Sequence, residues 1–222
     1  RSVEAFRATG RFDDIVVVIR DEHRALYDAA ASGLGLPDPV TGGATRQDSV
    51  RAALEWLEAR APDRVLVHDA ARPLVDRATI DRVLDALDEA EAAIAAVPVV
   101  DTIKRAEAGI AAGTVDRSGL WQAQTPQGFR FPALLAAHRA VAGEALTDDA
   151  AVAERQGIAV RLVEGHVDNF KITTEADLTR AERLLGGAAD IRTGTGFDVH
   201  RLIPGDAVIL CGIRIPHGFK LE

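Results

Sequence analysis

Two hydrophobic patterns alternate along the first 100 residues. Short, nearly continuous apolar runs rich in β-branched residues and alanine recur at residues 14–20, 65–68 and 93–100. Such runs are typical of strands buried on both faces. Helical spacing of apolar residues lies between them, at residues 21–31, 47–60 and 76–92. This alternation predicts an α/β fold with a doubly wound, mostly parallel sheet and right-handed crossovers.

The pattern changes after residue 100. Residues 101–105 lead outward and residues 114–121 return, which predicts a β-hairpin arm that projects from the sheet. An arm with little core of its own usually needs a partner surface, so a second subunit is expected to cover it. Helices and short strands then resume, with helices expected at residues 132–141, 147–156 and 174–185 and strands at 160–164 and 169–173.

The last 35 residues indicate a change of domain. Gly186 and Gly187 end the preceding helix, residues 188–192 form a linker, and residues 193–222 begin the second domain, of α/β type. A piece of about 30 residues rarely supports a core alone. The chain starts without a helix cap and stops without a natural turn, so the sequence predicts that both domains (1–187 and 193–222) continue beyond it.

Composition excludes several classes of protein. The net charge of −8 argues against a nucleic-acid-binding protein, which needs a basic face. A single cysteine allows no internal disulfide, and no apolar run approaches the ~20 residues that a membrane-spanning helix requires. No signal peptide opens the chain. A cytoplasmic protein with no membrane partner is expected.

The first candidate site follows the apolar run at 65–68. Asp69 comes directly after it, and the carboxyl ends of strands in α/β sheets are where ligands bind. Ala70 and Ala71 leave room for a ligand or backbone, and Arg72 offers a planar fork for phosphate or carboxylate. The alternative is a strand end with a capping aspartate and a surface arginine.

A second candidate is the glycine turn before the helix at 47–60. Gly42 and Gly43 precede the helix, whose first N–H groups and dipole favour a phosphate or a base edge. Arg46 and Ser49 would face the same ligand. A plain glycine turn with a capped helix explains the same residues.

A third candidate lies in the second domain. Asp198 and His200 are two apart on a predicted strand and would share one face, as ligands of Zn²⁺ or another divalent cation do. Two residues with this spacing form a weak motif, and a catalytic zinc needs about three protein ligands. The third ligand would have to follow Glu222.

Several motifs occur together in a recognisable order. Residues 67–73, 101–104, 116–127 and 168–173 resemble the 2-C-methyl-D-erythritol 4-phosphate cytidylyltransferase family in order and spacing. Residues 194–200 and 212–216 resemble the opening of 2-C-methyl-D-erythritol 2,4-cyclodiphosphate synthase. The tandem order is similar to the fused bifunctional enzymes of the non-mevalonate isoprenoid pathway.

The resemblance implies a reaction and its partners. The first family transfers CMP from CTP to methylerythritol phosphate with Mg²⁺ and releases pyrophosphate, and the second forms the cyclic diphosphate with release of CMP. The first family suggests a dimer through the arm and the second a trimer, so a homo-oligomer is expected. Catalysis of this kind is mostly positioning and charge stabilisation.

The resemblance also implies roles for individual residues. Gly42, Gly43 and Ser49 would contact the cytosine or ribose. Asp69 would lie by the α-phosphate and its metal, supported by Arg72, and Lys171 would hold the substrate phosphate. Further hydrogen bonds would come from Thr125 and Thr173, and the arm would carry two residues into the partner's site, Thr102 and Arg117.

One departure from the family pattern bears on activity. The family begins with a strand and a glycine-rich loop whose arginine and lysine bind the triphosphate, and nothing before Arg1 supplies them. The stretch alone is therefore expected to be inactive and the intact protein active. Two other functions remain open: a nucleotide-binding or interaction module without catalysis, and a related nucleotidyltransferase that uses another polyol phosphate.

Overall fold

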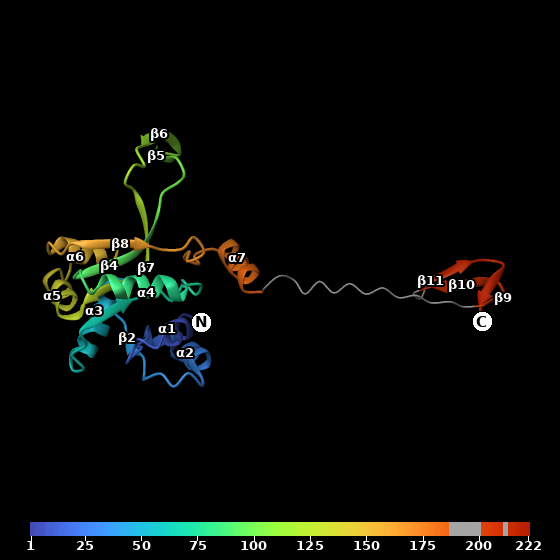
Figure 1. Ribbon diagram of the computed structural model, residues 1–222, viewed down its shortest axis with the longest axis horizontal. Coiled ribbons are helices and arrows are strands. Elements are labelled where there is room, and N and C mark those ends of the chain that lie inside the picture. The colour runs from blue at the N-terminus through green and yellow to red at the C-terminus, as the bar shows by residue number, and fades with distance from the viewer. Residues whose placement is uncertain (187–200, 211–212) are drawn as a thin grey trace. The chain divides into compact units, whose positions relative to one another are not determined.

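The structure, a computed structural model, describes residues 1–186, 201–210 and 213–222. They form two compact units, Arg1–Ala181 and Glu182–Glu222. The larger unit contains a four-stranded sheet in the order β3-β7-β4-β8, with helices on both faces (Figure 1). The α/β class is confirmed, and the sheet is mixed rather than parallel throughout. Its strands are β3 (Arg64–Val67), β4 (Ala92–Pro98), β7 (Trp121–Arg130) and β8 (Val160–Glu164).

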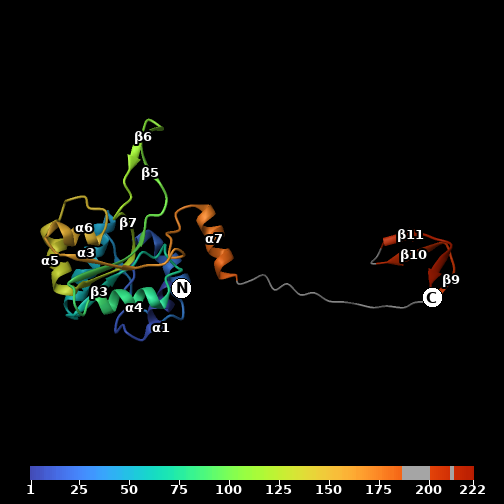
Figure 2. The same ribbon diagram turned by 45° about the horizontal axis from the view of Figure 1, so that its top comes forward.

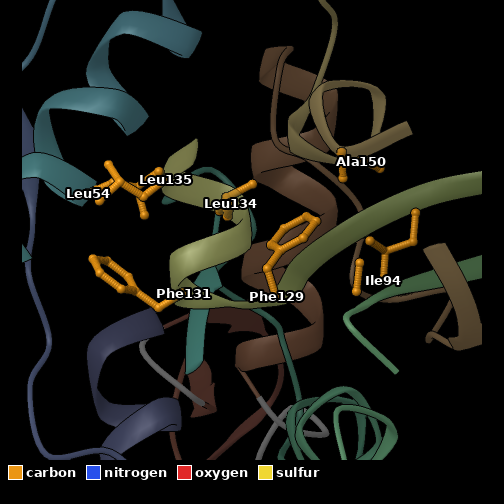
Figure 3. Close-up of a cluster of buried hydrophobic side chains, with 9 residues drawn as sticks. Leu54, Ile94, Phe129, Phe131, Leu134, Leu135 and Ala150 are labelled. Atoms are coloured by element: carbon orange, nitrogen blue, oxygen red, sulfur yellow. The ribbon is translucent and has the colours of Figure 1, made fainter. Parts of the chain in front are cut away.

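The strand β4 is one of the two inner strands of this sheet, and it is apolar at every position from Ala92 to Ala96, all of which are buried. It pairs in parallel with β8 and antiparallel with β7. Successive side chains point to opposite faces of the sheet. Ala92 and Ile94 therefore join the cluster of Phe129 and Leu134 shown in Figure 3, while Ala93 contacts the opposite cluster.

Helices cover the sheet according to their capping signals and apolar faces. The first face is covered by α3 (Arg46–Glu58), α5 (Phe131–Ala140) and α6 (Asp149–Arg155), and the other by α4 (Arg77–Ala86). The side chains of Thr45, Asp76 and Asp148 accept hydrogen bonds from the first turns of α3, α4 and α6. Phe6 of α1 (Ser2–Thr9) packs on α4.

The strand β7 is antiparallel because the chain leaves the sheet after β4 and returns through the arm. Its register against β4 shifts between Ile94 and Ala96, opposite the segment Gln124–Pro126. A register shift of this kind redirects side chains. Thr125 thereby reaches the loop that follows β3.

Two shorter features complete the larger unit. The strands β1 (Val18–Ile19) and β2 (Val40–Thr41) form a separate parallel pair. The 3₁₀ helix η1 (Asp21–His23) and the helix α2 (Arg24–Ala31) follow β1, and α3 follows β2. The predicted strand at 14–20 is thus paired only at its end. The arm consists of β5 (Ile103–Glu107) and β6 (Ile110–Val115), an antiparallel hairpin that extends away from the sheet (Figure 2).

The smaller unit begins within α7 (Glu175–Leu185) and contains two antiparallel pairs. The hairpin of β10 (Ala207–Leu210) and β11 (Ile213–Pro216) agrees with the sequence pattern, and β9 (Leu202–Pro204) pairs with β12 (Phe219–Leu221). In the part of the chain that the structure describes, no helix is long and apolar enough to cross a membrane.

Candidate active site

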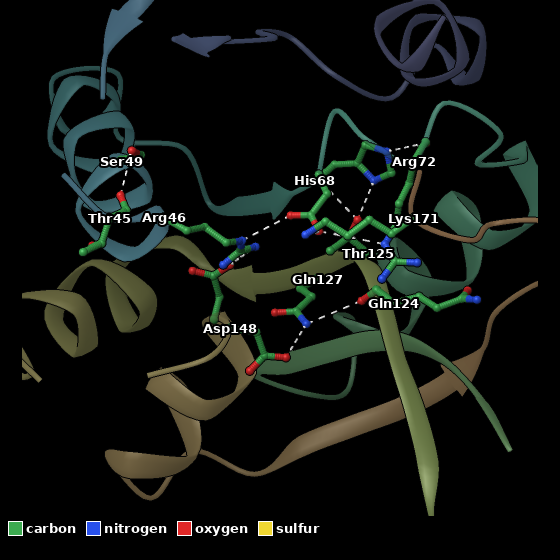
Figure 4. Close-up of polar contacts among 12 residues, drawn as sticks. Thr45, Arg46, Ser49, His68, Arg72, Gln124, Thr125, Gln127, Asp148 and Lys171 are labelled. Carbon is green, nitrogen blue, oxygen red and sulfur yellow. Dashed lines mark hydrogen bonds and ion pairs between the residues drawn. The ribbon is translucent and has the colours of Figure 1, made fainter. Parts of the chain in front are cut away.

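The carboxylate of Asp69 is surrounded by three cationic side chains. Its Oδ2 lies 3.0 Å from Lys171 Nζ, and its Oδ1 lies 3.2 Å from Arg46 Nε. Arg72 Nε is 3.9 Å from Oδ2, beyond hydrogen-bond distance. The Asp69 side chain is 15% exposed, whereas Lys171 is 44% exposed. Asp69 and Lys171 therefore open onto the same cavity. Figure 4 shows the side chains of Lys171, Arg72 and Arg46 in this region.

Arg46 and Asp69 come from two elements whose ends meet at this edge of the sheet. Arg46 is the first residue of α3, and Thr45 fixes that end by accepting a hydrogen bond from Asp48 N at 3.0 Å. Asp69 follows β3, which ends at Val67. The helix start and the strand end together place the guanidinium beside the carboxylate.

The segment that carries Lys171 is held by the loop after β3. Ile172 N donates to Ala71 O at 2.8 Å, and Arg72 Nη1 donates to Asn169 O at 2.7 Å. The sequence pattern predicts a strand here, but the segment is irregular. Its backbone groups bond to the Asp69 loop instead of to a sheet neighbour, and this bonding brings Lys171 to the cavity.

The charges around Asp69 control its ionisation. Burial would raise the pKa of Asp69, but the hydrogen bond from Lys171 and the charge of Arg46 outweigh it, so the pKa lies below its ordinary value. Burial likewise would lower the pKa of Arg46, but Asp149 and Asp69 raise it above its ordinary value. The carboxylate stays ionised near neutral pH, which suits a group that binds a cation.

His68 and Thr125 hold the backbone of Asp69. His68 Nε2 lies 3.0 Å from Arg72 O, and because a carbonyl only accepts, Nε2 carries the proton and donates. His68 Nδ1 therefore accepts from Thr125 Oγ1 at 3.0 Å. Thr125 Oγ1 in turn accepts from Asp69 N at 3.1 Å. Since its hydroxyl proton is committed to His68, Thr125 could meet a substrate only as an acceptor.

This relay predicts a dependence of stability on pH. Burial lowers the pKa of His68 from 6.5 to about 4. The hydrogen bond to the Arg72 carbonyl and the negative charge of Asp69 oppose this decrease, whereas the positive charge of the Arg72 side chain adds to it. Between pH 6.5 and 4, His68 is protonated in the unfolded chain and neutral in the folded chain. The free energy of unfolding therefore decreases as the pH falls through this window. We expect a loss of roughly 2–3 kcal/mol from this group. Urea unfolding of the wild type and His68→Gln at pH 7 and pH 4 measures it; equal pH-dependence in both proteins would contradict the assignment.

The cavity has a volume of about 230 Å³. Five residues that the sequence predicts as site residues line it: Arg46, Asp69, Arg72, Thr125 and Lys171. Sequence reasoning missed the remaining lining residues, which come from β7 and from the start of α6: Ala123, Gln124, Gln127, Thr147 and Asp148. The available signal was the run of polar residues at 122–127, because polar side chains in a buried strand need partners.

The glycine turn lies next to the cavity but does not line it. Ser49 Oγ accepts from Gly43 N at 3.2 Å. A Cβ at Gly42 would meet Ser49 Oγ at 2.7 Å, and one at Gly43 would meet Asp48 Cβ at 2.3 Å. Both positions therefore need glycine for the turn to pack on α3, and the same helix presents Arg46 to the cavity.

The other predicted residues occupy three surroundings. Ala70 is exposed beside Asp69. Thr173 is bonded through its N and Oγ1 to Asp177 Oδ2, each at 3.1 Å, at the start of α7. Thr102 and Arg117 lie at the base of the arm and do not line the cavity of their own chain, and Arg117 donates to Val100 O. These roles remain predictions.

Asp198 and His200 lie outside the described residues. Within residues 1–186, 201–210 and 213–222, no group of three or more His, Cys, Asp or Glu side chains could hold a metal ion. A Mg²⁺ ion differs from zinc because it accepts one or two carboxylates together with substrate phosphates. Two carboxylates line the cavity, those of Asp69 and Asp148, and Asp69 lies among the cationic side chains that would face substrate phosphates. The lining therefore fits that requirement.

Sequence comparison places these features in a family. The family model described as 2-C-methyl-D-erythritol 4-phosphate cytidylyltransferase matches residues 1–187. The bifunctional enzyme IspD/IspF of Rhodospirillum rubrum is 62% identical over 205 residues, which are 92% of this chain and 53% of that protein. The chain spans about half the length of the curated relatives it matches.

Solved structures agree with the sequence comparison. A crystal structure of 4-diphosphocytidyl-2C-methyl-D-erythritol synthase is 35% identical, with a TM-score of 0.74 over 83% of this chain and 87% of that one. The bifunctional IspDF from Campylobacter jejuni is 25% identical, with a TM-score of 0.66 over 100% of this chain and 56% of that one.

Proposed function

The chain belongs to the 2-C-methyl-D-erythritol 4-phosphate cytidylyltransferase family, and from this premise we propose that it transfers CMP from CTP to 2-C-methyl-D-erythritol 4-phosphate and releases pyrophosphate. The observation that carries the proposal is the 3.0 Å contact between Asp69 and Lys171 in one cavity. A carboxylate for a metal ion at the nucleotide end and an ammonium group for the second phosphate are thus adjacent, which suits a transfer between two phosphates.

In the reaction, an oxygen of the substrate phosphate attacks the α-phosphorus of CTP, and the bond from that phosphorus to the bridging oxygen of pyrophosphate breaks. Lys171 holds the attacking phosphate and offsets its charge. Arg72 and Arg46 stiffen the loop of Asp69 and add positive charge beside the reacting groups. Positioning of this kind supplies most of the rate in phosphoryl transfer.

Mg²⁺ is the proposed cofactor, with Asp69 as its protein ligand. When bound, it would neutralise charge on the α-phosphate and on the departing pyrophosphate. The ion pairs of Asp69 with Lys171 and Arg46 keep the carboxylate ionised and oriented beforehand.

The remaining site residues are proposed to bind the nucleotide and to add hydrogen bonds. Gly42, Gly43 and Ser49 hold the cytosine or ribose at the start of α3, next to Arg46. Ala70 leaves space for the α-phosphate beside Asp69. Thr125 and Thr173 add hydrogen bonds, with Thr125 as an acceptor.

A homodimer completes the site through the arm. The arm and its base expose large apolar side chains, such as Val100 at 73% and Ile110 at 74%. Several exposed apolar side chains on one projecting feature support an interface there. Thr102 and Arg117 then enter the partner's cavity from the base of the arm.

The relatives' names support a second activity. Residues 193–222 belong to a 2-C-methyl-D-erythritol 2,4-cyclodiphosphate synthase unit, in which Asp198 and His200 bind Zn²⁺ or another divalent cation. Such a unit releases CMP as it closes the cyclic diphosphate and adds a trimeric contact. The protein acts in the cytoplasm, without a membrane or nucleic acid as partner.

A pyrophosphate-release assay tests the proposed transfer. Full-length protein with CTP, Mg²⁺ and methylerythritol phosphate should release pyrophosphate, and omission of the polyol phosphate should stop it. Faster release with another polyol phosphate would favour a related nucleotidyltransferase. Binding of CTP without any release would favour a module that has lost catalysis.

A further inference from the structure

A histidine and an aspartate form a hydrogen bond inside the helical layer. His138 Nε2 of α5 lies 2.9 Å from Asp149 Oδ1 of α6, and the two side chains are 0% and 1% exposed. Apolar side chains of the main core cluster, such as Leu134, lie in the same helices. A buried carboxylate destabilises a fold unless it is paired, so packing alone does not account for this contact.

The second carboxylate oxygen of Asp149 contacts Arg46, a residue that lines the cavity. Asp149 Oδ2 lies 2.9 Å from Arg46 Nη2, and Arg46 Nε lies 3.2 Å from Asp69 Oδ1. One edge of the guanidinium therefore bridges two carboxylates, of which one is buried and the other lines the cavity. His138 donates to Asp149 Oδ1, because a carboxylate only accepts, and thereby turns Oδ2 toward Arg46.

The bridge matters when Asp69 changes its partners. In the proposed reaction Asp69 must face a metal ion and a phosphate, and its contact with Arg46 then weakens. Arg46 is one third exposed, so without a second carboxylate its side chain would follow Asp69 or turn into solvent. Asp149 is fixed by burial and by His138 and offers a partner that ligand binding does not alter.

We propose that Asp149, oriented by His138, is a positioning residue that holds the Arg46 guanidinium at the wall of the cavity. The inference rests on the proposed transfer only for its effect on rate. The contact itself is a property of the protein without ligands. Removing a group that orients a metal-binding side chain from behind typically lowers activity or affinity by about 10- to 100-fold, and we expect a loss of similar size here.

The first test is a double-mutant cycle in the full-length protein. Asp149→Asn should lower kcat/KM for CTP by about 10- to 100-fold. If Asp149 acts through Arg46, the double variant Asp149→Asn with Arg46→Ala should be no slower than Arg46→Ala alone. Effects that multiply, or an Asp149→Asn variant with wild-type kcat/KM, would overturn the proposal. The matched control is Asp88→Asn, which removes the partner of Arg64 away from the cavity and should leave kcat/KM unchanged.

The second test does not depend on turnover. Arg46 Nη2 lies 2.9 Å from Asp149 Oδ2. Its N–H signal in a ¹⁵N NMR spectrum, identified by its loss in Arg46→Ala, should therefore exchange slowly with water in the wild type and faster in Asp149→Asn. Unchanged exchange would refute the positioning role. If the wild type releases no pyrophosphate, the proposed transfer fails, and this measurement still decides the role of Asp149.

A third pair of variants covers the case in which Asp149→Asn does not fold. His138→Gln keeps a donor toward Asp149, whereas His138→Leu has similar size and no donor. The proposal is supported if, compared with the leucine variant, the glutamine variant shows slower exchange of the Arg46 Nη2–H signal and a higher kcat/KM. Equal values in the two variants count against it.

Discussion

Replacing Asp69 with asparagine is expected to lower kcat for pyrophosphate release by about 10³-fold, the upper range for loss of one preorganised electrostatic group. Asparagine keeps the shape of the side chain but removes the negative charge. That charge balances Lys171 and Arg46 at 3.0 and 3.2 Å and is the proposed ligand of Mg²⁺. Steady-state kinetics at saturating CTP and methylerythritol phosphate measure the effect.

The control for Asp69→Asn must separate charge at the site from charge elsewhere. Asp88→Asn also removes one half of an arginine pair, with 2.6 Å between Arg64 Nη2 and Asp88 Oδ1, but on an exposed surface. It should retain wild-type kcat, because exposed ion pairs contribute little. An Asp69→Asn variant that keeps more than a tenth of the wild-type kcat would remove Asp69 from the proposed chemistry.

Much of the fold could be predicted because its signals are local. The apolar run at 92–96 is buried on both faces, and the caps at Thr45, Asp76 and Asp148 are side chains that favour helix starts. The convergence of Asp69 and Lys171 followed from motif order, since both belong to segments that resemble one family. Local pattern and family resemblance therefore agreed on the sheet edge that carries the site.

The inner strand β7 was missed because three of its buried residues are polar and it contains Pro126. Gln124, Thr125 and Gln127 are each at most 4% exposed, yet no periodic apolar pattern marks them. Their burial depends on partners far along the chain, such as Asp148 for Gln127 at 2.8 Å. Contacts between residues so far apart in the chain are a tertiary property. Sequence spacing alone therefore could not show that these polar residues of β7 line the cavity.

Replacing Arg117 with alanine is expected to lower kcat by about 10²-fold while CTP affinity barely changes, because the arm is proposed to meet the substrate phosphate and not the nucleotide. Arg117 does not line the cavity of its own chain, and the arm extends away from that chain's sheet. Turnover and equilibrium CTP binding, measured on the same preparation, separate the two effects. Arg105→Ala removes another exposed arginine of the arm and serves as the control.

Subunit mixing decides whether Arg117 acts on the partner's site. In a mixed dimer of Arg117→Ala and Asp69→Asn chains, one cavity keeps Asp69 and receives an intact Arg117, and the other cavity has lost both. Random exchange makes half of the dimers mixed, each with one complete site, so the mixture should recover about a quarter of the wild-type rate. Neither variant alone can reach that rate. A mixture no faster than the average of its two components would mean that Arg117 serves its own chain, and the arm would then need another explanation.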